Sequence, residues 1–150
     1  MTGRTTPSDP ASDNGGAPID GTTTPCPFVT GTPVAIPPDS NSIVCQGGSL
    51  TVQNNNSGPD RECTQAHEEQ HKRDWEGRYG ENLCDGVSDG NLPVGGDGYS
   101  EFLRQSECDS YRVGKACREN LLASAEDADK PAIQAGIDRD DAQLAANSCD

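Results

Sequence analysis

Two short runs in the first half of the chain alternate β-branched and polar residues, and they predict a β-hairpin. Residues 42–45 read Ser-Ile-Val-Cys and residues 49–53 read Ser-Leu-Thr-Val-Gln. The segment 46–48 between them is Gln-Gly-Gly, and glycine readily adopts the positive φ angles that a tight turn requires. We therefore expect a small antiparallel sheet ahead of the helices.

The rest of the chain carries the capping and turn signals of three helices. The predicted helices run from Asp60, a suitable N-cap, to about Gly77; from Glu101, capped by Ser100, to about Ala125; and from Pro131, which suits a first turn, towards Asn147. The segment 85–98 holds five glycines and a proline, which predicts a loop between the first two helices.

These elements predict an α+β fold that is mainly α. Of residues 1–25, twenty are Gly, Pro, Ser, Thr, Asp or Asn. Such a composition buries too little apolar surface to offset the entropy that is lost when the chain is ordered. We therefore expect a disordered linker over residues 1–25 and a single domain over residues 26–150.

Composition indicates that this domain needs support beyond its core. Only 31% of the 150 residues of the chain are hydrophobic, and seven are cysteines. Disulfides or a bound metal supplement small cores of this kind, and disulfides persist in oxidising compartments. Residues 1–7 contain no apolar stretch like that of a signal peptide, and no run approaches the roughly 18 residues of a membrane span. We expect a protein delivered to the periplasm or the cell exterior, without a visible signal peptide and without a membrane span.

The charge of the chain argues against two kinds of partner. The formal net charge is -14, with only 11 lysines and arginines. A protein that binds nucleic acid or an anionic membrane neutralises phosphates with a basic face. We therefore expect neither partner, and we interpret the acidity as an aid to solubility, with a cationic substrate as the sharper alternative.

The first predicted helix contains the pattern His-Glu-x-x-His at His67, Glu68 and His71. Residues four apart lie on one helical face about 6 Å apart, so both imidazoles can reach one ion. Zinc acidifies water and polarises a carbonyl, and Glu68 projects beside the histidines, where it can accept a proton from that water. We therefore predict zinc ligands at His67 and His71 and a general base at Glu68.

Two structural explanations compete with this prediction. The histidines could stand four apart by coincidence, but they occupy the middle of the only face of the helix with apolar members, where each unbound polar group would cost about 1–3 kcal/mol to bury. A closed structural zinc site could use Cys63 and a remote cysteine. Because Cys63 and His71 are about 12 Å apart along the helix axis, that site would have to drop one histidine. In a catalytic site, Asp74 or Gln70 would orient an imidazole.

Glu107 is the predicted third ligand. The second helix carries Leu103, Glu107, Ser110, Gly114, Cys117 and Leu121 at steps of four and three, the spacing of a buried stripe. A carboxylate on such a stripe is costly unless a dication lies near it, and the small residues of the stripe would let the histidine helix approach closely. Asp109, on the neighbouring stripe, is the alternative ligand, Glu101 lies on neither stripe, and an exposed Glu107 is the structural alternative. Tyr111 could donate a hydrogen bond to a developing oxyanion or simply pack at the edge of the core.

The positions of the cysteines predict how they pair. If the second and third helices form an antiparallel hairpin that turns near residue 127, position 108 lies opposite about position 147, within a turn of Cys149. We therefore predict the pairs Cys108–Cys149, Cys84–Cys117 and Cys26–Cys45, with Cys63 left free.

The segment 63–75, which contains the whole motif, resembles the zincin-type metallopeptidase domains at the C-termini of bacterial polymorphic toxins and type VI secretion effectors. The segment 106–112 resembles the Glu-x-x-Ala third-ligand segment of gluzincins, with Ser110 in place of the alanine. The likeness covers roughly residues 60–122. It implies a metal held by two histidines and a glutamate, a cognate immunity protein, and a cleft edged by a strand that pairs with extended substrate. We expect residues 49–53 to form that strand.

Three functions fit these observations. The leading hypothesis is a zinc metallopeptidase that acts on a protein or peptide substrate, as a toxin domain in the envelope of a competitor. The second is a non-catalytic interaction module of a secreted carrier, stabilised by disulfides or a structural zinc. The third is metal-dependent hydrolysis of another bond, such as an amide of the cell wall. Glu68 separates the first from the second, because a structural site has no use for a general base.

Overall fold

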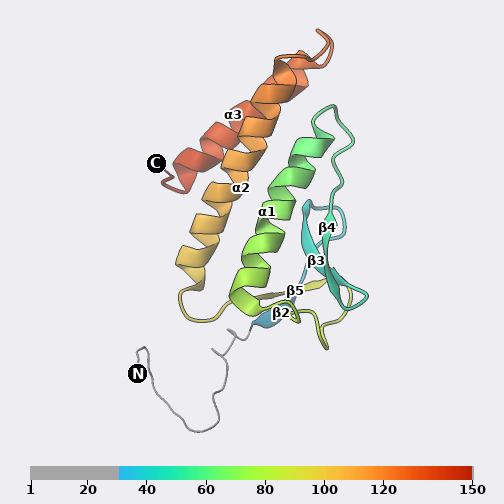
Figure 1. Cartoon of the computed structure of the whole chain (residues 1–150), viewed down its shortest axis with the longest axis vertical. Coiled ribbons are helices and arrows are strands. Elements are labelled where there is room, and N and C mark those ends of the chain that lie inside the picture. Colours follow the sequence, from blue (N-terminus) through green and yellow to red (C-terminus); the bar gives the residue numbers. More distant parts are fainter. Residues whose placement is uncertain (1–30, 150) are drawn as a thin grey trace, which may run out of the picture.

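The computed structural model describes residues 31–149, and its fold is α+β and mainly α, as predicted (Figure 1). Its strands are β2 (Thr32–Ala35), β3 (Ser42–Gln46), β4 (Ser49–Gln53) and β5 (Asn91–Val94), and its helices are α1 (Arg61–Tyr79), α2 (Tyr99–Leu122) and α3 (Lys130–Ala146). The linker predicted over residues 1–25 lies outside the described residues.

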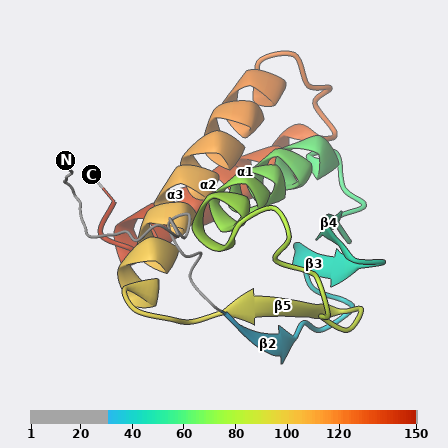
Figure 2. The same ribbon diagram turned by 60° about the horizontal axis from the view of Figure 1, so that its bottom comes forward.

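The helix α2 lies between α1 and α3 (Figure 1). Cys63 near the start of α1 is bonded to Cys117 near the end of α2, and Trp75 near the end of α1 contacts Phe102 near the start of α2. The two helices therefore run in opposite directions. The hairpin of β3 and β4 packs against α1, and both sheets lie on the side of α1 that faces away from α3 (Figure 2). Within residues 31–149, no helix is long and apolar enough to cross a membrane.

The ends of the helices follow their sequence signals with two exceptions. Pro131 lies in the first turn of α3, as expected. α1 continues through Gly77 to the buried Tyr79, because glycine inside a helix costs only about 1 kcal/mol, which packing can outweigh. α2 begins after Gly98, which has a φ of 75°, so Ser100 lies inside the helix and does not cap it.

The predicted hairpin is confirmed. β3 and β4 pair antiparallel, with Gln46 opposite Ser49. Gly47 and Gly48 form the turn with φ angles of 60° and 80°, which favour glycine and suit the twist of a two-residue hairpin.

A second sheet was not predicted. β5 pairs antiparallel with β2, so the interpretation of residues 85–98 as a loop was wrong for residues 91–94. Pro33 lies opposite Pro93 in this pair. Proline lacks the N–H that a strand normally donates, but it is tolerated at sheet edges, and both strands of a two-stranded sheet are edges.

The hydrophobic core lies between the hairpin, β5 and the C-terminal half of α1. Its buried members are Ile43, Cys45, Leu50, Trp75, Tyr79, Cys84 and Leu92. Trp75 donates a hydrogen bond of 2.8 Å from Nε1 to the carbonyl of Pro93, and its ring centroid lies 4.9 Å from that of Phe102. Because Trp75 is one turn beyond His71 on α1, this packing fixes the rotation of the helix face that carries the histidines.

Three disulfides link the six described cysteines. The pairs are Cys45–Cys84, Cys63–Cys117 and Cys108–Cys149. The prediction for Cys108–Cys149 is confirmed, whereas the Cys84–Cys117 and Cys26–Cys45 pairs and the free Cys63 were wrong, and Cys26 itself lies outside the described residues. Cys45 and Cys84 share the hydrophobic core, and the antiparallel packing of α1 on α2 brings Cys63 to Cys117. Three disulfides in a chain of this size are typical of an oxidising compartment.

A buried ion cluster joins all three helices. Arg118 of α2 donates from Nε to Asp60 at 2.8 Å and from Nη1 to Asp140 of α3 at 2.9 Å, and each of the three residues is at most 6% exposed. Asp60 precedes α1 as predicted, but its carboxylate bonds Arg118 and does not cap the helix. A Cβ on Gly136 would lie 2.6 Å from Nε of Arg118, and one on Gly114 would lie 2.9 Å from Nη1. The two glycines therefore provide the space that the guanidinium occupies.

We expect Arg118→Ala to lower the free energy of unfolding by about 3–5 kcal/mol, because two carboxylates then stay buried without their cation. Urea denaturation measures this loss. The matched control is Arg112→Ala, since Arg112 pairs with Asp109 where the side chains are 44% and 40% exposed, and such a pair contributes less than about 1 kcal/mol. Equal losses in the two variants would contradict the role assigned to the cluster.

Candidate metal centre

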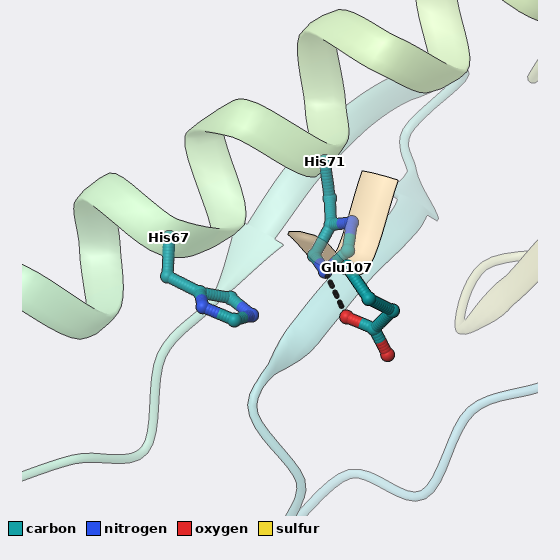
Figure 3. A group of neighbouring side chains, drawn as sticks. All are labelled: His67, His71 and Glu107. Carbon is teal, nitrogen blue, oxygen red and sulfur yellow. Dashed lines mark ion pairs between the residues drawn. The ribbon is translucent and has the colours of Figure 1, made fainter. Parts of the chain in front are cut away.

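His67 and His71 project from α1 towards Glu107 of α2 (Figure 3). One ligand atom from each of the three residues lies within 4.8 Å of the others. Nε2 of His71 and Oε1 of Glu107 are 2.9 Å apart. The structure therefore brings together the three residues that the sequence predicted as metal ligands, from two helices that a disulfide ties together.

Ser106 fixes the ring of His71. Its hydroxyl donates to Oδ2 of Asp74 at 2.6 Å, because a carboxylate can only accept. A hydroxyl has one hydrogen, so Ser106 accepts the 2.8 Å hydrogen bond from Nδ1 of His71. Nδ1 therefore carries a proton, and Nε2 is the nitrogen that faces Glu107 and can bind a metal. Gln70 donates to Asp74 at 3.0 Å. The two residues predicted to orient an imidazole therefore form one hydrogen-bonded chain, which reaches His71 through Ser106.

His67 lies between two other rings. Its ring centroid is 4.6 Å from that of Tyr111 and 5.0 Å from that of His71. Burial, followed by the nearby His71, lowers the pKa of His67 to about 4, so the imidazole is neutral near pH 7, the form that binds a metal. A Cβ on Gly114 would lie 3.7 Å from His67, an ordinary contact. Gly114 therefore lies within contact distance of the histidine helix, in agreement with the prediction, and it also leaves space for the guanidinium of Arg118.

Glu68 is buried beside these ligand atoms. Its Oε2 lies 3.8 Å from Nε2 of His67, and its side chain is 7% exposed. Burial raises the pKa of Glu68 to about 7, with the charge of Glu107 adding to the effect and His71 opposing it. A carboxylate with a pKa near neutrality can both accept and return a proton, which is what a general base must do.

Glu107 provides the negative charge of the cluster. Its side chain is 30% exposed. Burial acts to raise the pKa of Glu107, but the hydrogen bond and charge of His71, together with the charge of His67, hold it below its usual range. An ionised carboxylate is the form that binds a metal.

The other candidate ligands lie elsewhere. Asp109 forms an ion pair with Arg112, and Glu101 forms one with Arg104. Cys63 is disulfide-bonded, as is every other cysteine within residues 31–149. Neither the alternative ligand Asp109 nor a closed zinc site with Cys63 therefore agrees with the structure.

The donor set fits zinc. Two imidazole nitrogens and one carboxylate oxygen are common zinc donors, and three protein ligands are the number found in catalytic sites, whereas structural sites have four. Around a tetrahedral ion with bonds of about 2.0–2.1 Å, ligand atoms lie about 3.3 Å apart. The ligand atoms here are separated by 2.9 Å for the closest ion pair and by no more than 4.8 Å overall, a range that includes the tetrahedral separation.

A cleft lies over the cluster, and β3 forms its edge. Asn41, Ser42 and Ile43 line the cleft together with both histidines. The strand predicted at this edge, residues 49–53, is β4, which pairs with the other side of β3 and lines neither of the two cavities at the site. The strand of the hairpin that lies at the cleft is therefore β3 and not the predicted residues 49–53.

Sequence analysis missed Ser106 and Arg118. Ser106 follows Leu103 by three positions, and Arg118 follows Gly114 by four. Both therefore lie on the buried stripe of α2, and a polar residue on such a stripe needs a partner. That position was the available signal, although the partners themselves come from α1, from α3 and from the segment before α1.

We expect Ser106→Ala to weaken zinc binding by about 10–100-fold, because the ring of His71 loses the hydrogen bond that orients it. Competition with a chromogenic chelator measures the affinity. Ser100→Ala, an exposed position on the same helix, is the control and should bind zinc as tightly as the wild type. Unchanged affinity in Ser106→Ala would show that the hydrogen bonds through Ser106 do not support the site.

Comparisons of the chain with models of protein families, with curated proteins and with solved structures found no match.

Proposed function

We propose that the chain is a zinc-dependent peptidase that hydrolyses peptide bonds with Glu68 as its general base. The observation that carries this proposal is the convergence of His67, His71 and Glu107 next to a buried carboxylate at a cleft. Three ligands suit a catalytic zinc, and a structural site would have no use for Glu68 in that position.

The residues around the site support this proposal. When bound, zinc supplies a Lewis acid that polarises the carbonyl of the scissile bond and acidifies water. Glu68 accepts the proton of the attacking water at its carboxylate and passes it to the leaving amine. Tyr111 lines the cleft and donates a hydrogen bond to the oxygen on which negative charge develops. Burial raises the pKa of Tyr111 to about 12, so the hydroxyl keeps the proton that it donates.

The free edge of β3 can hold an extended substrate. Gln46 and Ser49 flank the two-residue turn, so the backbone of every second residue of β3, starting at Cys45, points away from β4. The carbonyl of Cys45 accepts a 2.8 Å hydrogen bond from Gly90 on that side. Ile43 has the same orientation and lies at the cleft, where an extended peptide can pair with it as an added strand.

We further propose that the protein acts outside the cytoplasm of the cell that makes it. Three disulfides support an oxidising compartment. The resemblance of residues 63–75 to the metallopeptidase domains of bacterial toxins supports an antibacterial role. In that role the producing cell requires an immunity protein that blocks the cleft.

The competing function is a secreted interaction module without catalysis. The three disulfides and the net charge of -14 favour it, because both suit a stable, soluble surface whether or not a reaction occurs. Hydrolysis of a cell-wall amide uses the same residues as the peptidase and differs only in substrate.

A cleavage assay with a peptide library tests the proposal. Zinc-loaded protein should cleave a subset of the library, a chelator should abolish cleavage, and added zinc should restore it. Protein that binds zinc but cleaves nothing would support the interaction module. Cleavage of cell-wall fragments in place of peptides would keep the metal chemistry and change the substrate.

A further inference from the structure

Two cavities meet at the proposed catalytic residues. Asn41, His67, Glu68 and Tyr111 line both. One cavity has a volume of about 660 Å³ and the other about 290 Å³. Neighbouring side chains of an extended peptide point to opposite sides, so a peptide that lies across the site sends one side chain into each cavity.

The smaller cavity combines the His67, His71 and Glu107 cluster with a wall of apolar side chains, and we name it the apolar arm. Its apolar lining includes Ile36, Ile43, Trp75, Leu92, Val94 and Leu103. These side chains come from the segment after β2 and from β3, β5, α1 and α2, so the wall is the outer face of the hydrophobic core. An apolar side chain gains from leaving water against this wall, whereas a charged one would lose its hydration there.

The larger cavity is polar, and we name it the polar arm. It is lined by Asp60, Arg118 and Asp140 of the buried ion cluster and by the carboxamides of Asn56 and Gln143. The apolar side chains that line this cavity are mainly alanines of α3. A large apolar side chain placed here would cover charged and amide groups without replacing their contacts with water.

The charges of the polar arm nearly cancel. Asp60 and Asp140 face Arg118 across hydrogen bonds, and the exposed Arg139 lines the same cavity. Two carboxylates thus oppose two guanidinium groups, and Glu68 stands at the junction. A charged substrate group meets both signs at short range, whereas a neutral amide or hydroxyl can donate to the carboxylates and accept from the guanidinium groups.

We infer that the substrate is a peptide cut between an apolar residue, held in the apolar arm, and a residue with a neutral hydrogen-bonding side chain, an amide or a hydroxyl, held in the polar arm. This inference rests on the peptidase function proposed above. It assigns the selection of the substrate to the polar arm, which is lined in part by residues of α3.

Trp75 allows the inference to be tested by binding alone. It is the only tryptophan of the chain and lines the apolar arm, so its fluorescence reports occupancy of that arm. The probes are capped peptides added to the zinc-loaded Glu68→Gln variant, which is expected not to cleave them. Ala-Leu-Gln-Ala and Ala-Gln-Leu-Ala cover both chain directions, and Ala-Leu-Leu-Ala, Ala-Leu-Glu-Ala and Ala-Glu-Leu-Ala are the comparison peptides.

One of the two mixed peptides should bind at least about tenfold more tightly than the all-leucine peptide and than both glutamate peptides. A second substitution, Ala135→Phe, fills the polar arm from the exposed face of α3 and should remove this preference. Ala145→Phe is the control, because Ala145 is exposed on the same helix outside both cavities, and it should keep the preference.

Equal affinity for the mixed and all-leucine peptides would overturn the inference, as would a preference that survives Ala135→Phe. The peptidase function is judged separately, from cleavage by the wild type. Cleavage of the all-leucine peptide as fast as the mixed ones would uphold the peptidase function and overturn the inference. A clear binding preference without any cleavage would support the two arms and overturn the peptidase function.

Discussion

Replacing Glu68 by glutamine is expected to leave zinc bound and to lower the turnover number at least about a hundredfold. Glutamine has nearly the same shape as glutamate but cannot accept the proton of the attacking water, and general base catalysis contributes about 10²–10⁴-fold. The side chain lies 3.8 Å from Nε2 of His67 without being one of the clustered ligands, so the metal site should persist. Zinc stoichiometry and peptide cleavage rate, measured on the same preparation, check both parts.

The control for this variant is Glu69→Gln. Glu69 is the next residue of α1, accepts a hydrogen bond from Gln65 at 3.0 Å and lines neither cavity, so its replacement should leave zinc binding and turnover unchanged. Full activity in Glu68→Gln would remove Glu68 from the catalytic role. Loss of zinc in that variant would instead indicate that Glu68 holds the site together.

Replacing Glu107 by alanine should weaken zinc binding at least about tenfold and abolish cleavage. The variant loses a ligand and also the partner that lies 2.9 Å from Nε2 of His71, and even residues that only support the ligands change metal affinity by about 10–100-fold. Isothermal titration of the metal-free protein with zinc measures the affinity.

Asp109→Ala and Glu101→Ala are the controls on the same helix. Each removes a carboxylate that pairs with an arginine away from the cluster, so both variants should keep the zinc affinity and the activity of the wild type. If Asp109→Ala is the variant that loses zinc, the face of α2 has been assigned wrongly and Glu107 is an ordinary surface residue.

The clustering of His67, His71 and Glu107 was predictable because its main signal is local. The spacing of His67 and His71 places both on one helical face whatever the fold, and the stripe of α2 identified Glu107 as a carboxylate that needs a cation. The partners of Ser106 were not predictable in this way. Its hydrogen bonds to Asp74 and His71 depend on how α2 packs on α1, which periodicity alone does not determine.

Two of the three disulfides could not be derived from the pattern of one helix or from the second and third helices alone. The same antiparallel packing that brings Glu107 to His71 carries Cys63, two turns earlier on α1, to Cys117, nearly three turns later on α2. The predicted third ligand therefore implied this disulfide, but the pairs were derived from the second and third helices alone. Cys45–Cys84 joins β3 to the segment after α1, and no local pattern connects these two segments.

The second sheet escaped prediction for a different reason. The segment 91–94 is short, contains a proline and has glycines on both sides, and these features are all signals of a loop. β5 forms because it pairs with β2, whose residues lie 56 positions earlier for Ala35 and Asn91 and 62 positions earlier for Thr32 and Val94. Pairing between strands so far apart along the chain depends on the tertiary fold, and local sequence patterns do not predict it.

The most direct test of the central claim is X-ray absorption at the zinc edge on the purified, zinc-loaded wild type. The account predicts one zinc per chain with only nitrogen and oxygen neighbours at about 2.0–2.1 Å, including the outer-shell scattering of two imidazole rings. The spectrum of Glu107→Ala should show a changed first shell with both imidazoles retained. A sulfur neighbour at about 2.3 Å, or protein that binds no stoichiometric zinc, would contradict the assignment of His67, His71 and Glu107 as a catalytic metal site.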